Sequence, residues 1–483
     1  MNMAYDKKID DYIESRKDLF IDVNDKIWEF SELGYDEEKS ADLLNSVLVE
    51  EGFTVQKDLA GMQTALIGSF GSGSPVIAIL GEYDALSGLS QEKCIAEKKV
   101  IEKGGSGHGC GHNSLGAGAL AACFAVKKYL EENDISGTVR FYGCPAEEGG
   151  SGKGFLARDG FFDDVDVALT WHPGSLNGVW SASCLAVVSA YFKFTGKSAH
   201  AAANPHAGRS ALDAVELMNV GANYLREHVI PEARLHYAIT DTGGIAPNVV
   251  QPEAEVYYFV RAPKLDQVQG IYERVCDIAK GAALMTGTTL EIDYEGGMSH
   301  YLPNSVLDAV LYENLKAYGP PRFDESDREF ALEMRKTFTD IDLKTEISLA
   351  TQIFGMPAKE AAQQIEGKEL ADFILPYLTS NIALPGSTDV GDVSLVVPTS
   401  QFSAATLAIG TPGHSWQTVS QSASTIAHKG LLAAGKVLAG TAIDIFNEPQ
   451  IVAKAKEQHQ IDMAGEPYNC PIPADRKPGV KEI

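Results

Sequence analysis

The sequence has few cysteines and no long apolar segment. Its 483 residues include only seven cysteines, and an odd, scattered set argues against a framework of disulfide bonds. No uninterrupted apolar run reaches the roughly eighteen residues of a membrane span. The charged start, MNMAYDKKIDDYIESRKDLF, lacks the apolar core of a signal peptide. These absences predict a protein of the reducing cytoplasm that is not inserted in a membrane.

Basic residues are also scarce. There are 40 Lys and Arg against 66 Asp and Glu, which gives a net charge of −26. Such a charge favours solubility and opposes non-specific binding to nucleic acid. An anionic substrate would therefore need specific cationic side chains to capture it. The apolar content of 45% is that of a soluble globular protein, and the length predicts two or three structural units.

The most distinctive stretch is GHGCGHNSLG, residues 107–116. It places His108, Cys110 and His112 at alternate positions, which would face one side of an extended segment. Thiolate and imidazole groups at this spacing suit a transition-metal site, and the intervening glycines leave room for close approach of the backbone. The alternative is a Gly-rich loop with incidental histidines. The following run, LGAGALAACFAVKKYL, predicts a helix.

Potential ligands also follow several predicted strands. The segments that carry them are PVIAILGEYDAL, GTVRFYGCPAEEGG, DVALTWHPG and TLAIGTPGHSWQ. Each residue alone has a simpler explanation, because charged residues at strand ends are usually solvated. Their repetition along consecutive α/β units instead predicts a site at the carboxyl edge of a sheet. The residues concerned are Glu82, Asp84, Glu147, Glu148, His172 and His414.

The pattern of predicted strands and helices changes between about residue 185 and residue 297. This stretch predicts a strand–helix–strand–strand–helix–strand order, which is the ferredoxin-like arrangement. It therefore divides the chain into a first part of an α/β domain (1–184), an inserted domain (185–297), a second part of the α/β domain (298–445) and a C-terminal tail (446–483). The tail ends in a polar, Pro-rich stretch that we expect to wrap the surface or fray.

Taken together, these motifs resemble the M20 metallopeptidase/amidohydrolase family. The likeness also rests on SAHAAANPHAGRSALDA, APNVVQPEAEVYYFVRAP and GSTDVGDVS, and it covers roughly residues 15–445. It is strongest for the branch of p-aminobenzoyl-glutamate and amino-acid-conjugate hydrolases. The resemblance implies an α/β catalytic domain, with a mixed sheet covered by helices on both faces, that holds two divalent metal ions. It also implies that the inserted domain is a lid through which two chains dimerise.

The resemblance assigns roles at the strand ends. Glu147 would be the general base, and Asp84 would orient an imidazole ligand. The sequence departs from the usual family motifs because Glu82 replaces a histidine and Cys110 replaces a bridging carboxylate. The thiolate favours zinc over magnesium, with manganese or cobalt as alternatives. The implied metal ligands are Cys110, His112, Glu148, His172 and His414.

Three lid residues also match family motifs. The resemblance implies that His200 stabilises the oxyanion, often from the partner subunit, and that Asn248 and Arg261 contact the substrate. The planar guanidinium of Arg261 suits a carboxylate, because it can bond both oxygens. The simpler alternatives are a structural contact for His200 and a strand-end charge for Arg261. Weaker candidates are His108, His206, Arg209 and Asp389.

The predicted function is metal-dependent hydrolysis of the amide bond in a small carboxylate-bearing substrate. Candidates are p-aminobenzoyl-glutamate, an N-acyl amino acid or a dipeptide. A contrasting hypothesis is a catalytically silent regulatory or binding subunit of a hetero-oligomeric amidohydrolase, although every expected ligand position holds a competent residue. The predicted partners are a second copy of the chain and, as a further candidate, a second related subunit.

Overall fold

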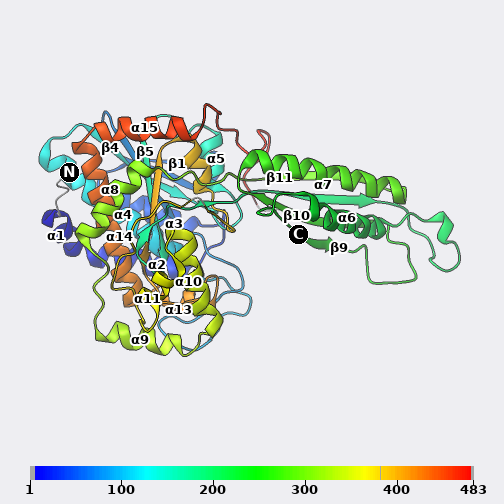
Figure 1. The fold of residues 1–483 in the computed structure, drawn as a ribbon, viewed down its shortest axis with the longest axis horizontal. Helices are drawn as coiled ribbons and strands as arrows, with labels where there is room; N and C mark the ends of the chain where they lie inside the picture. Colours follow the sequence, from blue (N-terminus) through cyan, green and yellow to red (C-terminus); the bar gives the residue numbers. More distant parts are fainter. Residues whose placement is uncertain (1–5, 381, 480–483) are drawn as a thin grey trace.

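The computed structural model describes residues 6–380 and 382–479. These residues form a broad, helix-rich main domain from which a long, narrow lid projects (Figure 1). We use the name lid for residues Ala186–Met298, which contain four strands and two helices. The lid joins the main domain at only one of its ends (Figure 1), so the outer end stands well away from the central sheet.

A seven-stranded mixed sheet forms the centre of the main domain, in the order β1-β2-β4-β3-β5-β13-β6. The four strands β4, β3, β5 and β13 run parallel, while β1, β2 and β6 pair antiparallel with their neighbours. The carboxyl ends of the parallel strands therefore lie along one edge, where ligand sites of α/β sheets form. The strands are β1 (Thr54–Leu59), β2 (Met62–Ser72), β3 (Val76–Glu82), β4 (Gly137–Cys144), β5 (Val167–Gly174), β6 (Gly178–Val179) and β13 (Thr399–Ala405).

Helices cover both faces of this sheet, so the predicted α/β fold is confirmed. The residues from Ile77 to Leu80 in β3 are fully buried, which explains their uninterrupted apolar run. Gly116 brings the start of α4 against the end of β3, since a Cβ there would lie 2.7 Å from the Glu82 carbonyl oxygen. One face packs on α1 (Lys7–Ser15), α2 (Lys17–Phe30), α3 (Glu38–Glu50), α4 (His112–Asn133), α8 (Ser305–Tyr318) and α14 (Thr425–Asn447), and the other on α5 (Gly152–Arg158) and α12 (Val390–Val396).

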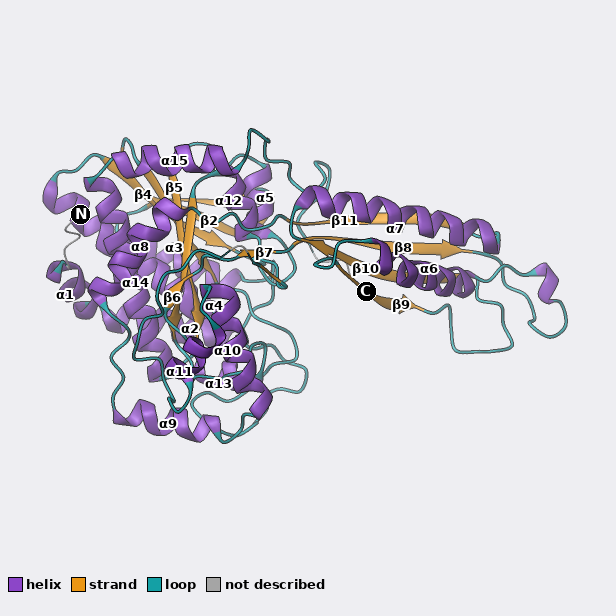
Figure 2. Cartoon of the chain, viewed as in Figure 1, coloured by secondary structure: helices purple, strands orange, loops and turns teal. Residues whose placement is uncertain are grey.

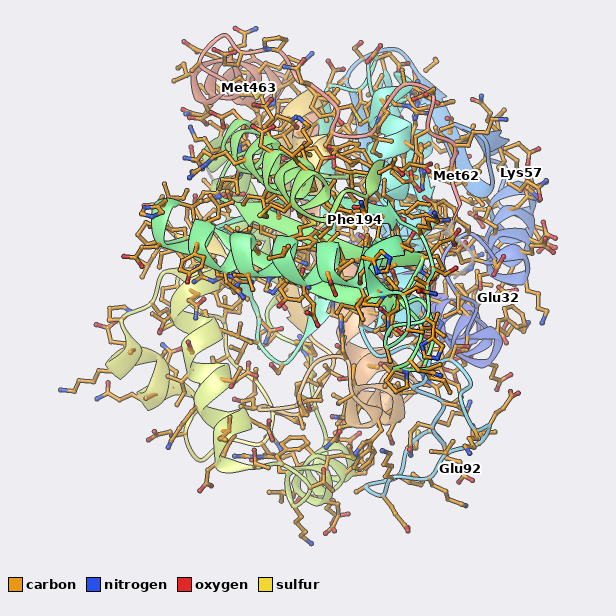
Figure 3. All side chains as sticks on the ribbon, turned by 90° about the vertical axis from the view of Figure 1, so that its right-hand side faces the viewer. Glu32, Lys57, Met62, Glu92, Phe194 and Met463 are labelled. Atoms are coloured by element: carbon orange, nitrogen blue, oxygen red, sulfur yellow. The ribbon has the colours of Figure 1, made fainter. Side chains whose placement is uncertain are left out.

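The lid is an antiparallel sheet with two helices on one face (Figure 2). Its strand order, β11-β8-β10-β9, is ferredoxin-like. Alternate residues of β10 from Ala254 to Ala262 are buried under the helices, whereas Tyr257, Phe259 and Arg261 lie on the opposite face. Figure 3 looks along the lid toward the main domain, with Phe194 in the lid core. The elements are β8 (Ala186–Thr195), α6 (Ala211–Leu225), β9 (Arg234–Asp241), β10 (Glu253–Ala262), α7 (Leu265–Thr286) and β11 (Thr289–Met298).

The remaining elements complete the main domain beside the central sheet. A short parallel pair joins β7 and β12 near the base of the lid. Among the described residues, α14 alone has the length and apolar composition of a membrane span, but 78% of its most apolar window is buried inside the protein. These elements are β7 (Ser183–Cys184), α9 (Glu325–Arg335), α10 (Asp340–Phe354), α11 (Ala358–Ile365), β12 (Ala383–Leu384) and α13 (Trp416–Gln421). Short 3-10 turns at Pro205–Ala207 and Arg226–His228 belong to the lid.

Of the two expectations for the end of the C-terminal tail, wrapping the surface agrees with the structure as far as Gly479. Helix α14 continues to Asn447, and α15 (Gln450–Asp462) follows it directly. Beyond α15, the chain leaves the main domain and reaches the base of the lid (Figure 1). Ile472 in this last stretch is only 4% exposed. Pro471 and Ile472 are thus buried, whereas the rest of this irregular segment, as far as Gly479, is exposed or half-buried.

Candidate metal centre

All five predicted metal ligands lie together at the carboxyl edge of the central sheet. The ligand atoms of Cys110, His112 and His172 are within 4.8 Å of one another, and so are those of Cys110, Glu148 and His414. They come from the loop before α4 and the start of that helix, the turn after β4, the strand β5 and the loop after β13. Cys110 belongs to both groups. The geometry therefore provides two adjacent groups, each able to hold a cation, that share the Cys110 thiol.

The distances within each group suit a bound transition metal. Two nitrogen, oxygen or sulfur ligands of a tetrahedral zinc ion lie roughly 3.3–3.6 Å apart, given bond lengths of about 2.0–2.3 Å. The Cys110 Sγ to His172 Nε2 distance is 3.5 Å, and the His414 Nε2 to Glu148 Oε1 distance is 3.3 Å. Within the described chain, the buried His112 Nε2 and Glu148 Oε1 have no hydrogen bond. Buried polar atoms without hydrogen-bond partners require another explanation, and a cation bound by each of the two groups would supply one.

Asp84 organises two of the ligands. Its side chain is 1% exposed, with Oδ1 2.7 Å from His112 Nδ1 and Oδ2 accepting a hydrogen bond of 2.8 Å from the Glu148 backbone N–H. A proton on Nδ1 leaves His112 Nε2 free to face a metal ion. His172 is oriented similarly, with Nδ1 2.7 Å from the Pro173 carbonyl oxygen.

The candidate ligands influence each other's ionisation. Burial opposes ionisation of the Cys110 thiol, but His112 and His172 hold its pKa well below the usual value. Contacts with Cys110 and then Glu148 raise the pKa of His414 to about 10. Thiolate is the form of cysteine that binds metal. A bound cation would take the place of the protons that the histidines carry at neutral pH.

Glu147 lies beside the ligands without belonging to either group. One of its carboxylate oxygens lies within 4.8 Å of ligand atoms of Glu82 and His112. Burial, together with the carboxylates of Glu82 and Asp389, raises the pKa of Glu147 well above its usual value. A carboxyl group with a raised pKa can exchange protons near neutral pH, as a general base and acid must.

A buried ion network that sequence reasoning missed supports this region. Lys153 Nζ lies 2.6 Å from Glu82 Oε1 and 2.6 Å from Asp389 Oδ1, and all three side chains are almost fully buried. The Lys153 backbone N–H also donates to Asp389 at 2.8 Å. The network holds Glu82 with its other oxygen 3.2 Å from His112 Nε2. A lysine in a Gly-rich turn gives no sequence signal of such a role.

His108 does not join the cluster, contrary to the expectation that three alternate residues face one pocket. Its ring Nε2 lies 3.0 Å from the Ile27 carbonyl oxygen. Burial lowers the pKa of His108 to about 4, so the ring is neutral. The alternation fails because the chain bends between His108 and Cys110, where the Gly109 N–H donates to the Gly107 carbonyl oxygen at 2.8 Å. It turns again at Gly111, which has a φ of 80° before the helix begins at His112. The segment is thus a turn into a helix and not an extended strand.

A cavity of about 360 Å³ opens beside the cluster, between the main domain and the inner face of the lid. Glu147, Glu148 and His414 line it from the main domain, and Arg261 and Phe259 line it from the lid. The Arg261 guanidinium donates to Ser387 Oγ at 3.0 Å. No carboxylate among the described residues pairs with Arg261, so this cation is available to an anionic ligand.

The other two predicted lid residues, His200 and Asn248, lie away from this cavity. His200 and Asn248 belong to neighbouring loops at the outer end of the lid, where Ala201 N–H donates to the Asn248 carbonyl oxygen at 2.9 Å. The His200 ring accepts from the backbone N–H groups of Ala202 and Ala203 at 3.2 Å. Neither residue lines the cavity beside Cys110. Within one chain, the structure therefore does not bring them to the metal centre.

The fold and the site define a metal-dependent hydrolase of the α/β type. Residues 78–375 match the family model described as peptidase family M20/M25/M40, and the chain belongs to this family. It is 47% identical to one subunit of the p-aminobenzoyl-glutamate hydrolase of Escherichia coli (strain K12), over 97% of this chain and 98% of that protein. Another subunit of the same hydrolase is 26% identical over 50% of this chain and 57% of its own length.

Solved structures show the same fold. A putative aminohydrolase from methicillin-resistant Staphylococcus aureus superposes with a TM-score of 0.65 at 17% identity, covering 91% of this chain and 99% of its own. A dinuclear metal-binding peptidase of the M20 family from Bacillus subtilis gives a TM-score of 0.57 at 17% identity, covering 90% and 99%. These likenesses agree with the predicted fold, while the family model and the Escherichia coli relative confirm the predicted family.

Proposed function

We propose that the protein hydrolyses the amide bond of a small carboxylate-bearing substrate, with p-aminobenzoyl-glutamate as the first candidate and N-acyl amino acids or dipeptides as alternatives. The main support is the pair of three-residue groups that share Cys110 and lie beside Glu147. Glu148 and His414 of one group line the same cavity as Arg261, which no carboxylate of the described residues pairs with. We further propose zinc as the metal, because a shared thiolate favours it, and the cytoplasm as the location, because seven free thiols suit a reducing compartment.

Cys110, His112 and His172 would hold one ion, and Cys110, Glu148 and His414 the other. Two divalent ions bound there would polarise the substrate carbonyl and lower the pKa of water. Glu147 takes a proton from the attacking water as the new C–O bond forms. It then gives that proton to the leaving nitrogen as the C–N bond breaks. The products are a carboxylate and an amine.

The substrate preference follows from the lining of the cavity. Arg261 would bind the carboxylate of the amino-acid part with two parallel hydrogen bonds. Tyr257 and Phe259 line the same lid face, and their rings lie 5.1 Å apart. Aromatic side chains suit a planar acyl group. An aromatic acyl-glutamate, which the name of the Escherichia coli relative describes for that protein, satisfies both features.

We also propose a homodimer formed through the lid. Strand β9 is an edge of the lid sheet, and Tyr237 and Ile239 on it are 39% and 41% exposed. On α6, Val220 and Tyr224 are 51% and 75% exposed. An apolar edge of this kind is suited to pairing with a second copy. The partner would then present His200 and Asn248 to this metal centre, which they do not reach within one chain. A related second subunit is the other candidate partner.

The direct test is a hydrolysis screen of the purified chain with zinc, manganese and cobalt. The substrates are p-aminobenzoyl-glutamate, N-acyl amino acids and dipeptides. We expect metal-dependent release of amine from at least one of them. In parallel, Arg261→Ala should raise KM for a carboxylate-bearing amide but leave its uncharged amide analogue unchanged. A metal-replete chain that cleaves none of these substrates would support the silent-subunit hypothesis and reject the proposal.

A further inference from the structure

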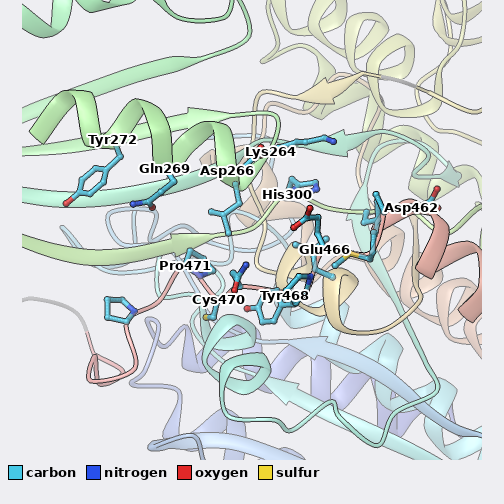
Figure 4. A pocket seen from close by; sticks show the side chains of 18 of the residues that line it. Lys264, Asp266, Gln269, Tyr272, His300, Asp462, Glu466, Tyr468, Cys470 and Pro471 are labelled. Carbon is cyan, nitrogen blue, oxygen red and sulfur yellow. The ribbon is translucent and has the colours of Figure 1, made fainter.

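The segment after α15, residues Glu466–Gly479, runs from the main domain along the base of the lid. Figure 4 shows Tyr468, Cys470 and Pro471 beside the start of α7, with a groove between them lined by Asp266, Gln269 and Tyr272. Tyr468 donates a hydrogen bond of 3.0 Å to Asp392 in the main domain. Tyr294 of the lid donates one of 3.0 Å to the Pro471 carbonyl oxygen. The segment is thus attached to both domains.

Ile472 is wedged between the two domains. A Cβ on Gly154 of α5 would lie 2.9 Å from Ile472 Cδ1, and a Cβ on Gly296 of β11 would lie 3.4 Å from Ile472 Cγ1. Glycine at these positions therefore permits the close approach of an apolar side chain that is 4% exposed. Packing of this tightness is sensitive to the loss of a few methyl groups. The contact is built into the fold and is not a loose surface association.

Arg476 attaches the segment to the lid on the face of the sheet opposite its helices. Arg158 of α5 donates hydrogen bonds to the carbonyl oxygens of Pro473 and Arg476, at 3.0 and 2.7 Å. The Arg476 guanidinium lies 3.2 Å from Asp293 Oδ1 and 3.9 Å from Glu295 Oε1. Ile472, Arg476, Lys477 and Gly479 all line the cavity that also contains Glu147, Glu148 and His414. The tail is therefore one boundary of the candidate active site.

The strand register places this boundary away from Arg261. Arg261 of β10 lies opposite Val187 of β8, which in turn lies opposite Met298 of β11. Asp293, the partner of Arg476, lies opposite Tyr191, which is paired on its other side with Tyr257. Four residues along a strand and two strand spacings separate the backbone positions of Arg261 and Asp293 by roughly 15 Å. If Arg261 holds the carboxylate of the amino-acid part, the tail faces the acyl part of the substrate.

We propose that residues Glu466–Gly479 form a wall of the substrate site and determine which acyl groups the enzyme accepts. This inference rests on the proposed amidohydrolase function. Tyr257 and Phe259 would support one side of a planar acyl group, and the tail would enclose it from the side of β11. Arg476 acts as a positioning residue, because its bonds to Asp293 and Glu295 keep the tail against the lid.

The test compares two substrates that share glutamate and differ in the acyl group, p-aminobenzoyl-glutamate and N-acetyl-glutamate. A chain that ends at Gly465 should lose at least about 10-fold in kcat/KM for the aromatic substrate, mainly through KM. It should change less than about 3-fold for the acetyl substrate. Arg476→Gln should shift the same ratio by at least about 3-fold, and Arg476→Lys should restore part of the shift. Zinc content should remain that of the wild type.

Lys456→Gln is the matched control, because this residue of α15 forms a surface ion pair with Asp166 and does not line the cavity. It should leave the ratio unchanged. An equal loss on both substrates, or an unchanged ratio in both tail variants, would overturn the proposal. A shortened chain that fails to fold leaves Arg476→Gln to decide. A wild-type chain inactive on every amide would reject the proposed function itself, whereas an active wild type with an unchanged ratio would reject only the role of the tail.

Discussion

Replacing Asp84 by asparagine should weaken metal binding without changing any ligand. The carboxylate now accepts two hydrogen bonds, from His112 Nδ1 at 2.7 Å and from the Glu148 backbone N–H at 2.8 Å. An asparagine side chain has a single acceptor oxygen. The backbone N–H of Glu148 cannot change its role, so the amide oxygen would face it and the amide NH₂ would face His112. The histidine proton would then move to Nε2, the atom that faces the metal.

The cost is one charge-assisted hydrogen bond, about 1.5–3 kcal/mol, which corresponds to a loss of roughly 10- to 100-fold in metal affinity. Competition with a chromophoric zinc chelator measures the dissociation constant directly. Asp164→Asn is the matched control, because that carboxylate pairs with Arg140 away from the site. An Asp84→Asn affinity within about 3-fold of the wild type would refute the reasoning on tautomer control.

Three further outcomes are expected. Glu147→Gln should retain both metal ions and lose at least about 100-fold in kcat, and near-normal turnover in a metal-replete variant would exclude Glu147 as the base. At pH 8, zinc binding to the metal-free protein should release at least one proton, because the pKa of His414 is raised to about 10. Calorimetry in two buffers of different ionisation enthalpy measures the number of protons released. Release of no proton would contradict the ligand assignment. Burial raises the pKa of Asp308 to about 8, so the folded state favours the protonated carboxyl. The resulting contribution to the free energy of unfolding is complete below about pH 4 and is lost as the pH rises toward 8. The fall in Tm between pH 5 and pH 8 should therefore be smaller in Asp308→Asn than in the wild type, and equal falls would contradict this role of Asp308.

The strand ends were predictable because parallel strands buried on both faces have a recognisable sequence. The apolar run ending at Glu82 and the strand ending near His172 indicate both the element and its carboxyl end. Once several such ends carry potential ligands, the topology of the sheet brings them together. The cluster of Cys110, His112 and Glu148 was therefore accessible from residue types and positions before any coordinates.

The rest depends on contacts that have no periodic signature. His108 follows the same alternation as Cys110, but the chain bends at residues 109–110, and only the fold determines that the ring lies against the Ile27 carbonyl oxygen. Lys153 is buried because Glu82 and Asp389 meet it from distant segments. Ile472 is one apolar residue in a polar, Pro-rich stretch, and its burial requires two glycines on two domains. Local sequence carries none of this information.

The most direct measurement of the central claim is a crystal structure of the zinc-loaded enzyme with diffraction data on both sides of the zinc absorption edge. We predict two anomalous peaks per chain, each about 2.3 Å from Cys110 Sγ, with His112 and His172 at one and Glu148 and His414 at the other. A single peak, or two ions that leave Cys110 unbound, would contradict a binuclear centre organised around this thiolate.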